Sequence, residues 1–429
     1  MNDYYILNYI KAKYGIDDNV FEALKLDLDR RVYYYGRHFK YSSEGGWLLR
    51  DIVFLKIRDF IKEIYINSRI ILNNIALNRK GRKILSNSYF SVNSELKKFG
   101  FGVYSPSLCM NGDKNILTDY NLYNITKRLQ KVIKKGDFNE LFSDALLNKI
   151  EDFKESLKEF VVENNFAAIC VPTDICLFEN LSIQVFRSVK KPSFVFLHGL
   201  PARYSVIEDN RADYLVVWGD KIKENFVKAG VKKEKIFVSG HPNYRDFKTR
   251  ELRYNFDNVL VISKSMNGAL YSDKVVLSDR GNLITYLYSI QNALEKVQVK
   301  SARIRLHPSE NYVWYKKFID TDFYKIDTGL LLQSLKEATL VVGPTSSVFL
   351  ESTYYGVNYT VYEPCDKEFD LIGFKLVPPF DGSDPMVPVA KTEKDLISFF
   401  KNKIVNSPNF FGEYIKSQFD ISFIEKIIG

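Results

Sequence analysis

Short apolar runs that alternate with helical segments are the feature that most constrains the fold of this chain. Each run is rich in β-branched or aromatic residues, as expected for strands buried on both faces of a parallel sheet. The first set is Ile84–Val92, Phe166–Val171, Ser193–Leu197, Tyr214–Trp218 and Lys235–Ser239. After a polar stretch at 245–258 the pattern resumes with Asn258–Ser263, Ala302–Leu306, Thr339–Val342 and Tyr359–Tyr362. The alternation predicts two α/β domains, each with a doubly wound parallel sheet.

The length supports this division, because 429 residues are too many for one hydrophobic core. We expect a helical segment at 1–80, a first Rossmann-like domain at 81–250 and a second at 251–429. Lys149–Glu163 is predicted to be a helix of the first domain. The last predicted helices, Glu393–Val405 and Phe411–Ile428, either close the second domain or cross back to the first.

The N-terminal segment contains one pronounced amphipathic stretch, Phe54–Ile75, with apolar residues at helical spacing between Lys and Arg. Packing against the first domain is the simpler explanation and the preferred one. The alternative is a basic, aromatic-rich face that rests on the anionic inner leaflet of a membrane.

Composition limits the class of partner. The net charge of +9 suits phosphorylated substrates, an anionic membrane surface or nucleic acid. The absence of zinc-finger spacing and of long basic runs argues against nucleic acid. No window approaches the roughly 18 unbroken apolar residues of a membrane span, and the N-terminus lacks signal-peptide features. With only four cysteines (Cys109, Cys170, Cys176, Cys365) and no CxxC pair, a disulfide framework is not expected, and we predict a cytoplasmic protein.

Three of the four histidines follow predicted strands: His198 in FLHGLP, His241 in SGHPN and His307 in RLHPSE. Each is followed by Gly or Pro, which ends the strand. Ligands of open parallel sheets bind at the carboxyl ends of the strands, so the shared context predicts a ligand cleft between the domains. The alternative is three unrelated loop histidines, each bonded to a local carbonyl. His38 lacks this context and is expected to be structural.

The segment TLVVGPTSSVFLE at 339–351 is the strongest candidate for an anion site. An apolar strand runs into Gly343, then into Thr345, Ser346 and Ser347, and then into an apolar helix. Hydroxyls and free backbone N–H groups at a helix start can bind a phosphate, although ordinary helix capping would use one hydroxyl in the same way. Glu351 is either an acceptor for ribose hydroxyls or a solvated helix residue.

Two further sets of residues complete the predicted ligand site. Arg305 and His307 alternate along one strand end and therefore share a face, where they could hold a phosphate or a pyrimidine edge. Lys264 and Ser265, with Gly268, form a candidate phosphate loop.

Two DxD triplets, Asp27/Asp29 and Asp320/Asp322, do not form a convincing metal site. Arg305, His307 and a helix dipole could neutralise a leaving phosphate without Mg²⁺. We therefore expect a metal-independent reaction with no cofactor beyond the nucleotide-sugar donor.

Taken in order, HGLP, GHPNYRD, RLHP and GPTSSVFLE resemble bacterial GT-B glycosyltransferases of capsule and lipopolysaccharide assembly. The pattern is most similar to polysialyltransferases and other enzymes that use CMP-activated nonulosonic acids or Kdo. The resemblance implies that His307-Pro308 and Ser346-Ser347 hold the cytidine monophosphate. Teichoic-acid polymerases, which use CDP-polyols, have a WHGTP-like segment similar to 197–201 and an SSV segment similar to 346–348.

The resemblance covers about residues 166–364, and it departs from the polysialyltransferases at one important place. Those enzymes carry an acidic pair before the glycine where this chain has Leu197-His198-Gly199. The group that activates the acceptor is therefore not identified by motif.

A single displacement at the anomeric carbon predicts an inverting glycosyltransferase. His198 is the preferred general base, because an imidazole exchanges protons near neutral pH, and Gly199 helps to fix it at the sheet edge. Asp174, Glu179 and Glu44 are the carboxylate alternatives. Arg203, with Arg305 and His307, would offset phosphate and carboxylate charge.

The predicted acceptor is a glycan or lipid-linked glycan of the bacterial surface. Three other functions fit the same pattern. They are a CDP-polyol phosphotransferase, a UDP-sugar transferase or 2-epimerase, and a non-catalytic carbohydrate-binding or scaffold protein.

Overall fold

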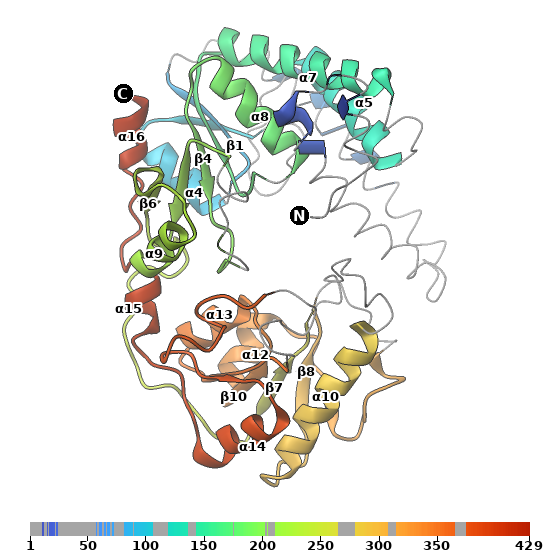
Figure 1. Cartoon of the computed structure of the whole chain (residues 1–429), viewed down its shortest axis with the longest axis vertical. Helices are drawn as coiled ribbons and strands as arrows, with labels where there is room; N and C mark the ends of the chain where they lie inside the picture. Colours follow the sequence, from blue (N-terminus) through green and yellow to red (C-terminus); the bar gives the residue numbers. More distant parts are fainter. Residues whose placement is uncertain are drawn as a thin grey trace.

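The computed structural model contains two α/β domains that lie one above the other in Figure 1. It describes residues 81–88, 90–105, 119–135, 143–174, 176–201, 204, 211–264, 279–307, 315–364 and 375–429, with scattered positions between 11 and 72. Each domain is built on a six-stranded sheet in which every paired strand is parallel. The predicted fold class, two Rossmann-like doubly wound domains of the GT-B kind, is confirmed.

The first sheet has the strand order β2-β1-β3-β4-β5-β6. Its strands are β1 (Lys83–Ser86), β2 (Gly102–Tyr104), β3 (Phe166–Val171), β4 (Ser193–Phe196), β5 (Tyr214–Val217) and β6 (Ile236–Val238). Its helices are α4 (Phe90–Lys98), α5 (Tyr120–Lys135), α7 (Asp144–Glu163), α8 (Leu177–Ser188) and α9 (Asp220–Lys228). Because β2 and β3 lie on opposite sides of β1, the strand order reverses between β1 and β3.

The apolar runs form central strands because both faces of this sheet are covered. Ile169, Val171 and Val195 pack in one cluster with apolar side chains of α5, α7 and α8. Ala168 and Phe194, which point to the other face, pack with α4 and the C-terminal segment. Successive side chains of a strand alternate between faces, so a strand covered on both sides must be apolar throughout.

The second sheet has the order β12-β11-β10-β7-β8-β9, the arrangement of the dinucleotide-binding Rossmann sheet. Its strands are β7 (Val259–Ile262), β8 (Ala302–Arg305), β9 (Tyr324–Ile326), β10 (Leu340–Gly343), β11 (Tyr359–Tyr362) and β12 (Val389–Ala390). Its helices are α10 (Asp279–Glu295), α12 (Leu331–Glu337), α13 (Val348–Tyr354) and α14 (Glu393–Asn402). Here the strand order reverses between β7 and β10.

One predicted strand is too long. Ile84–Val92 was expected to be a single strand, but β1 ends at Ser86 and α4 begins at Phe90. The Ser86 hydroxyl donates to Asn93 Oδ1 (2.6 Å) and accepts the Ser88 N–H (3.2 Å), which turns the chain into the helix. The polar residues between the apolar ones therefore mark a turn.

The predicted helix Phe411–Ile428 is in fact two short helices, α15 (Phe410–Tyr414) and α16 (Phe423–Ile428). Between them the backbone bonds to the carboxyl edge of the first sheet: Lys416 N–H donates to Trp218 O (2.9 Å) and Asp420 N–H to Ser239 O (2.8 Å). Ile424 of α16 packs in the same cluster as Phe194. The C-terminus thus crosses back to the first domain, as Figure 1 also shows.

The described part of Phe54–Ile75 is helical at every position, but its apolar residues are exposed. The exposed fractions run from 52% at Ile57 to 65% at Phe60. For these residues the preferred expectation, packing against the first domain, is wrong. Among the helices that the structure describes, none has the length and apolar character needed to cross a membrane.

Candidate functional site

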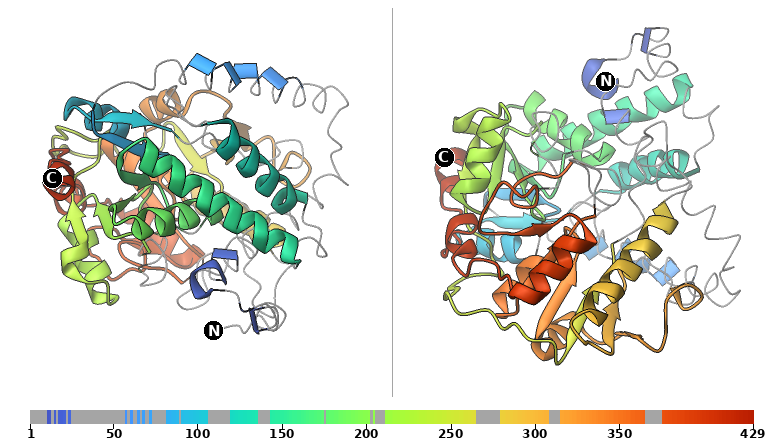
Figure 2. Two further views of the ribbon diagram at one scale, coloured as in Figure 1. Left: turned by 90° about the horizontal axis from the view of Figure 1, so that it is seen from above. Right: turned by 60° about the horizontal axis from the view of Figure 1, so that its bottom comes forward.

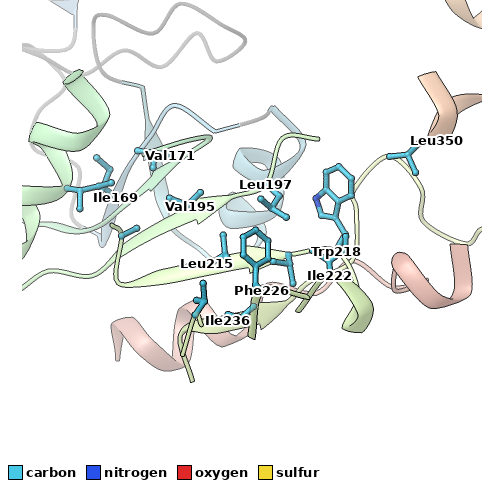
Figure 3. Close-up of a cluster of buried hydrophobic side chains, with 14 of the residues drawn as sticks. Ile169, Val171, Val195, Leu197, Leu215, Trp218, Ile222, Phe226, Ile236 and Leu350 are labelled. Carbon is cyan, nitrogen blue, oxygen red and sulfur yellow. The ribbon is translucent and has the colours of Figure 1, made fainter. Parts of the chain in front are cut away.

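The carboxyl edges of the two sheets meet. Tyr244, which follows β6, lies 5.3 Å from Tyr354 of α13 between ring centroids. Trp218, which follows β5, belongs to the same buried cluster as Leu350 of α13, and the two stand at one end of the group drawn in Figure 3. Because α13 begins after the carboxyl end of β10, this packing sets the carboxyl edge of the first sheet beside the helix that starts at the ligand-binding edge of the second.

In the second domain, the chain after β10 is held in a fixed path. A Cβ on Gly343 would lie 2.1 Å from the Tyr359 hydroxyl oxygen, so only glycine fits there. That hydroxyl donates a hydrogen bond of 2.6 Å to Pro344 O. Thr345 and Ser346 are half-buried and Ser347 is exposed, so the start of α13 is open on one side.

The hydroxyls of this loop do little capping. Ser346 Oγ accepts the Val348 N–H at 3.3 Å, and the N-cap residue Ser347 makes no side-chain capping bond. Ordinary helix capping therefore accounts for one of the three hydroxyls. A phosphate-binding role for Ser346 and Ser347 stays a prediction.

A buried ion pair occupies the middle of this edge. Lys264 Nζ lies 2.7 Å from Glu363 Oε1, and the two side chains are 11% and 0% exposed. The same Glu363 oxygen accepts the Thr345 N–H at 2.5 Å. The sequence suggested that the Lys264 ammonium and the backbone N–H groups near Thr345 bind a phosphate. In the structure, the Lys264 ammonium and the Thr345 N–H both bind Glu363 Oε1. The pair lies at the reversal between β7 and β10, where α/β sheets bind ligands.

Glu363 was missed from the sequence. It directly follows the buried strand β11, which neighbours β10, and an acid in that position at a parallel-sheet edge is the signal that could have found it. Its partner Lys264 was identified because it follows β7.

Glu351 lies in the first turn of α13. Burial raises the pKa of its carboxyl group, and its Oε2 atom is buried without a hydrogen-bond partner among the described residues. Thr345 Oγ1 is likewise buried without a hydrogen-bond partner among the described residues. The expectation of a solvated helix residue is therefore wrong. The alternative, an acceptor for ribose hydroxyls, stays a prediction.

Arg305 and His307 occupy the end of β8, but the structure uses them differently. Arg305 Nη1 donates to Asp327 Oδ1 (3.2 Å), Gly329 O (2.7 Å) and Ser334 Oγ (3.3 Å). His307 is exposed, and its backbone N–H donates to Ser263 Oγ (3.0 Å). To hold a phosphate, Arg305 would have to share its guanidinium with Asp327.

In the first domain, His198 follows β4 with its ring exposed. Its Nδ1 lies 3.2 Å from Pro172 O. Because a carbonyl oxygen only accepts, Nδ1 carries the proton in this contact and Nε2 of the neutral ring has the lone pair that a base needs. Gly199 has open space around the position of a Cβ, so packing does not require glycine there.

Glu179 lies in the first turn of α8, at the reversal between β1 and β3. Its Oε1 accepts a hydrogen bond of 2.9 Å from Asn87 Nδ2, and Asn87 is the residue that follows β1. The structure therefore brings Glu179 to the same edge as His198, and both remain candidate bases.

Asp174 is at this edge too, but inside the protein. Its side chain is fully buried, accepts the Arg211 backbone N–H and lies 3.6 Å from the Arg211 guanidinium. These contacts tie the loop after β3 to the chain that enters β5. We therefore place Asp174 with the structural residues.

His241 lies in the junction between the domains. Its Nδ1 accepts the Asn243 N–H (3.1 Å), and its ring meets Trp218 edge-on at 4.4 Å between centroids. Burial lowers the pKa of His241 to about 4. The imidazole is thus held neutral as part of the packing between the sheet edges.

The depressed pKa of His241 predicts a pH-dependent stability. The unfolded chain takes up a proton near pH 6.5 and the folded chain only near pH 4, so this contribution to folding is complete above pH 6.5 and is lost as the pH falls toward 4. The difference amounts to about 3 kcal/mol. In urea unfolding at a series of pH values, wild type should lose its advantage over His241→Phe across this interval. Parallel curves for the two proteins would contradict the assignment.

Several predicted residues lie outside the described part of the chain: His38, Glu44, Arg203, Ser265, Gly268 and Pro308. The same holds for Asp27, Asp29, Cys109 and Cys365. The two described cysteines, Cys170 and Cys176, are not joined in a disulfide. Within the described ranges no three His, Cys, Asp or Glu residues are grouped as metal ligands. Asp320 of the second DxD triplet closes a turn, where its Oδ1 accepts the N–H groups of Asp322 and Phe323.

No protein-family model matches this chain, and no curated protein matches its sequence. Solved structures with a similar course of the chain exist. One is the UDP-GlcNAc 2-epimerase of Neisseria meningitidis bound to UDP-GlcNAc (TM-score 0.45, 12% identity, covering 81% of this chain and 98% of that one). Others are the S. aureus MnaA–UDP co-structure (0.47, 11%, 81% and 95%) and Acinetobacter baumannii MurG (0.40, 10%, 76% and 91%). At this level the fold assignment rests on the strand order of the two sheets in this chain.

Proposed function

We propose that this protein is an inverting glycosyltransferase that uses a nucleotide-activated sugar. The observation that carries the proposal is the meeting of two unlike sheet edges. One presents proton acceptors, His198 and Glu179, and the other presents the hydroxyl groups of Ser346 and the exposed Ser347 at the start of α13. A transfer reaction needs both, a base for the acceptor and a binding site for the leaving phosphate.

The Glu363 carboxylate supports the donor side of the proposal. An oxygen of Glu363 accepts from two donors that follow different strands, Lys264 after β7 and Thr345 after β10, and so fixes the loop that carries Ser346 and Ser347. We propose that the donor phosphate binds beside this pair, at Ser346 and the exposed Ser347. Glu351, half-buried on α13, would accept hydrogen bonds from the ribose hydroxyls.

On the acceptor side, His198 Nε2 takes the proton of the attacking hydroxyl. The acceptor oxygen forms a bond to the anomeric carbon as the bond from that carbon to the phosphate oxygen breaks, and the electron pair leaves on the phosphate. The sugar configuration inverts because attack and departure occur on opposite faces. No covalent enzyme intermediate is needed.

The base of the nucleotide is proposed to be cytosine, on the strength of the similarity of the HP and SS motifs to enzymes with CMP-linked nonulosonic acid or Kdo donors. A bacterial surface glycan is the corresponding acceptor. A CDP-polyol phosphotransferase and a UDP-sugar transferase or 2-epimerase are the alternatives that the sequence leaves.

A thermal-shift panel of CMP, CDP, UDP and GDP tests the donor. A nucleotide at 100 times its dissociation constant stabilises the folded state by about 2.7 kcal/mol, so a bound nucleotide raises the melting temperature measurably. We expect CMP to give the largest shift, and Ser346→Ala with Ser347→Ala to reduce it. A preference for UDP or GDP would remove the cytidine proposal. No shift with any of the four would remove the nucleotide site.

Product analysis separates the remaining classes. A transferase extends an added glycan acceptor and releases the nucleoside monophosphate or diphosphate. A 2-epimerase changes the sugar without an acceptor, and a CDP-polyol phosphotransferase consumes CDP-glycerol or CDP-ribitol.

A further inference from the structure

The amphipathic stretch Phe54–Ile75 is not used by the proposed reaction, and its described residues form an exposed apolar stripe. The large apolar members are each more than half exposed: Ile57, Phe60, Ile61, Ile64, Ile71 and Leu72. All are helical, and Figure 2 shows the short blue pieces of this stretch at the periphery of the ribbon. Monomeric soluble proteins rarely leave such a group of large apolar residues uncovered.

The spacing places these residues on one side of a helix. At about 100° per residue, the six positions fall within an arc of about 120°. Ser68, also exposed, is the polar position inside the arc. An apolar stripe of this width is what a helix buries when it lies flat on an apolar surface.

The charge of the stretch indicates what kind of surface the apolar stripe contacts. The stretch Phe54–Ile75 contains four Lys and Arg against two Asp and Glu, and residues 50–82, which include its flanks, contain eight against three and so carry +5 of the net charge of +9. The basic residues within the stretch are Lys56, Arg58, Lys62 and Arg69. Long basic side chains can keep their stems on the apolar surface while their charged ends reach anionic headgroups.

We infer that the stripe of residues 57–72 lies in the headgroup region of an anionic lipid bilayer. A second protein surface would need acidic partners for the basic residues and apolar contacts for the stripe, whereas an anionic bilayer offers both along its whole area. The inference does not depend on the nucleotide site, because no residue of the stripe belongs to either sheet edge.

Vesicle flotation with the full chain tests the inference. The probes are vesicles of phosphatidylcholine alone and vesicles in which about a third of the lipid is phosphatidylglycerol. We expect the protein to float with the anionic vesicles and to be released by high salt. Phe60→Ser with Ile61→Ser and Ile64→Ser should weaken partitioning by roughly tenfold or more, because these residues supply the buried apolar area.

A second variant and a matched control keep the test decisive. Lys56→Gln with Arg58→Gln and Lys62→Gln retains every apolar residue, and at about fivefold per charge should weaken binding on the order of 100-fold. Val162→Ser with Phe318→Ser and Leu330→Ser removes three exposed apolar residues elsewhere, 46–77% exposed, and should bind like wild type.

Three outcomes would overturn the inference. They are failure of wild type to float with anionic vesicles, equal loss in the control variant, and a change of oligomeric state in the serine variant without any lipid binding. The last would assign the stripe to a second copy of the chain. Circular dichroism of each variant establishes that it is folded before flotation.

Discussion

Replacing Lys264 by Met should lower the free energy of unfolding of the second domain by about 3–5 kcal/mol, because it leaves a buried carboxylate without its counter-ion. Glu363 is fully buried, and Lys264 is its ion-pair partner at 2.7 Å. After the substitution the Thr345 N–H still donates to Glu363, but a neutral donor does not replace an ammonium group. Urea unfolding followed by circular dichroism measures the loss.

The double variant Lys264→Met with Glu363→Gln is the matched control. It removes both charges while the glutamine carbonyl can still accept the Thr345 N–H. Since replacing a buried ion pair as a whole is often nearly neutral, the double variant should recover most of the lost stability. A double variant as unstable as Lys264→Met would show that the ion pair is not the cause.

The fold could be predicted because the central strands are buried on both faces. FAAICV and YTVY are strands over the residues expected from the sequence, since apolar character on both faces leaves no ambiguity about where they begin and end. The short strands Gly102–Tyr104, Tyr324–Ile326 and Val389–Ala390 were missed. All three lie at a sheet edge or pair over two or three residues, and so few positions give no periodic pattern.

The C-terminal segment shows a different limit. Phe411–Ile428 has enough apolar residues for one helix, but residues 416 and 420 give their backbone N–H groups to the first sheet edge. That competition depends on residues about 200 positions earlier in the chain, which local propensity cannot register.

The sequence predicted where the site residues lie better than it predicted which residues they bond to. The rule that ligands bind at the carboxyl ends of parallel strands placed His198, Lys264 and Thr345 at the edges that meet. It could not show that Arg305 is engaged by Asp327, or that Asp174 is buried against Arg211. Which charges pair with one another is decided by side chains from distant elements.

Replacing His198 by Ala should lower kcat by about 10²–10⁴-fold, the usual contribution of a general base, once the acceptor is identified. Because the His198 ring is exposed, its removal should change stability by no more than about 0.5 kcal/mol. The nucleotide-induced thermal shift should also be retained, since the donor groups come from the other domain. A steady-state assay with both substrates, beside the thermal-shift panel, measures the two effects separately.

Two matched variants distinguish a base from a residue that only holds the loop. His198→Asn keeps an N–H that can donate to Pro172 O but has no group that takes a proton, so it should be as inactive as His198→Ala. Glu179→Gln keeps an oxygen that can accept the Asn87 amide and should retain activity within about tenfold, because it preserves position and removes only charge. If His198→Asn were active and Glu179→Gln were not, the proton acceptor would be Glu179, and His198 would only position the loop after β4.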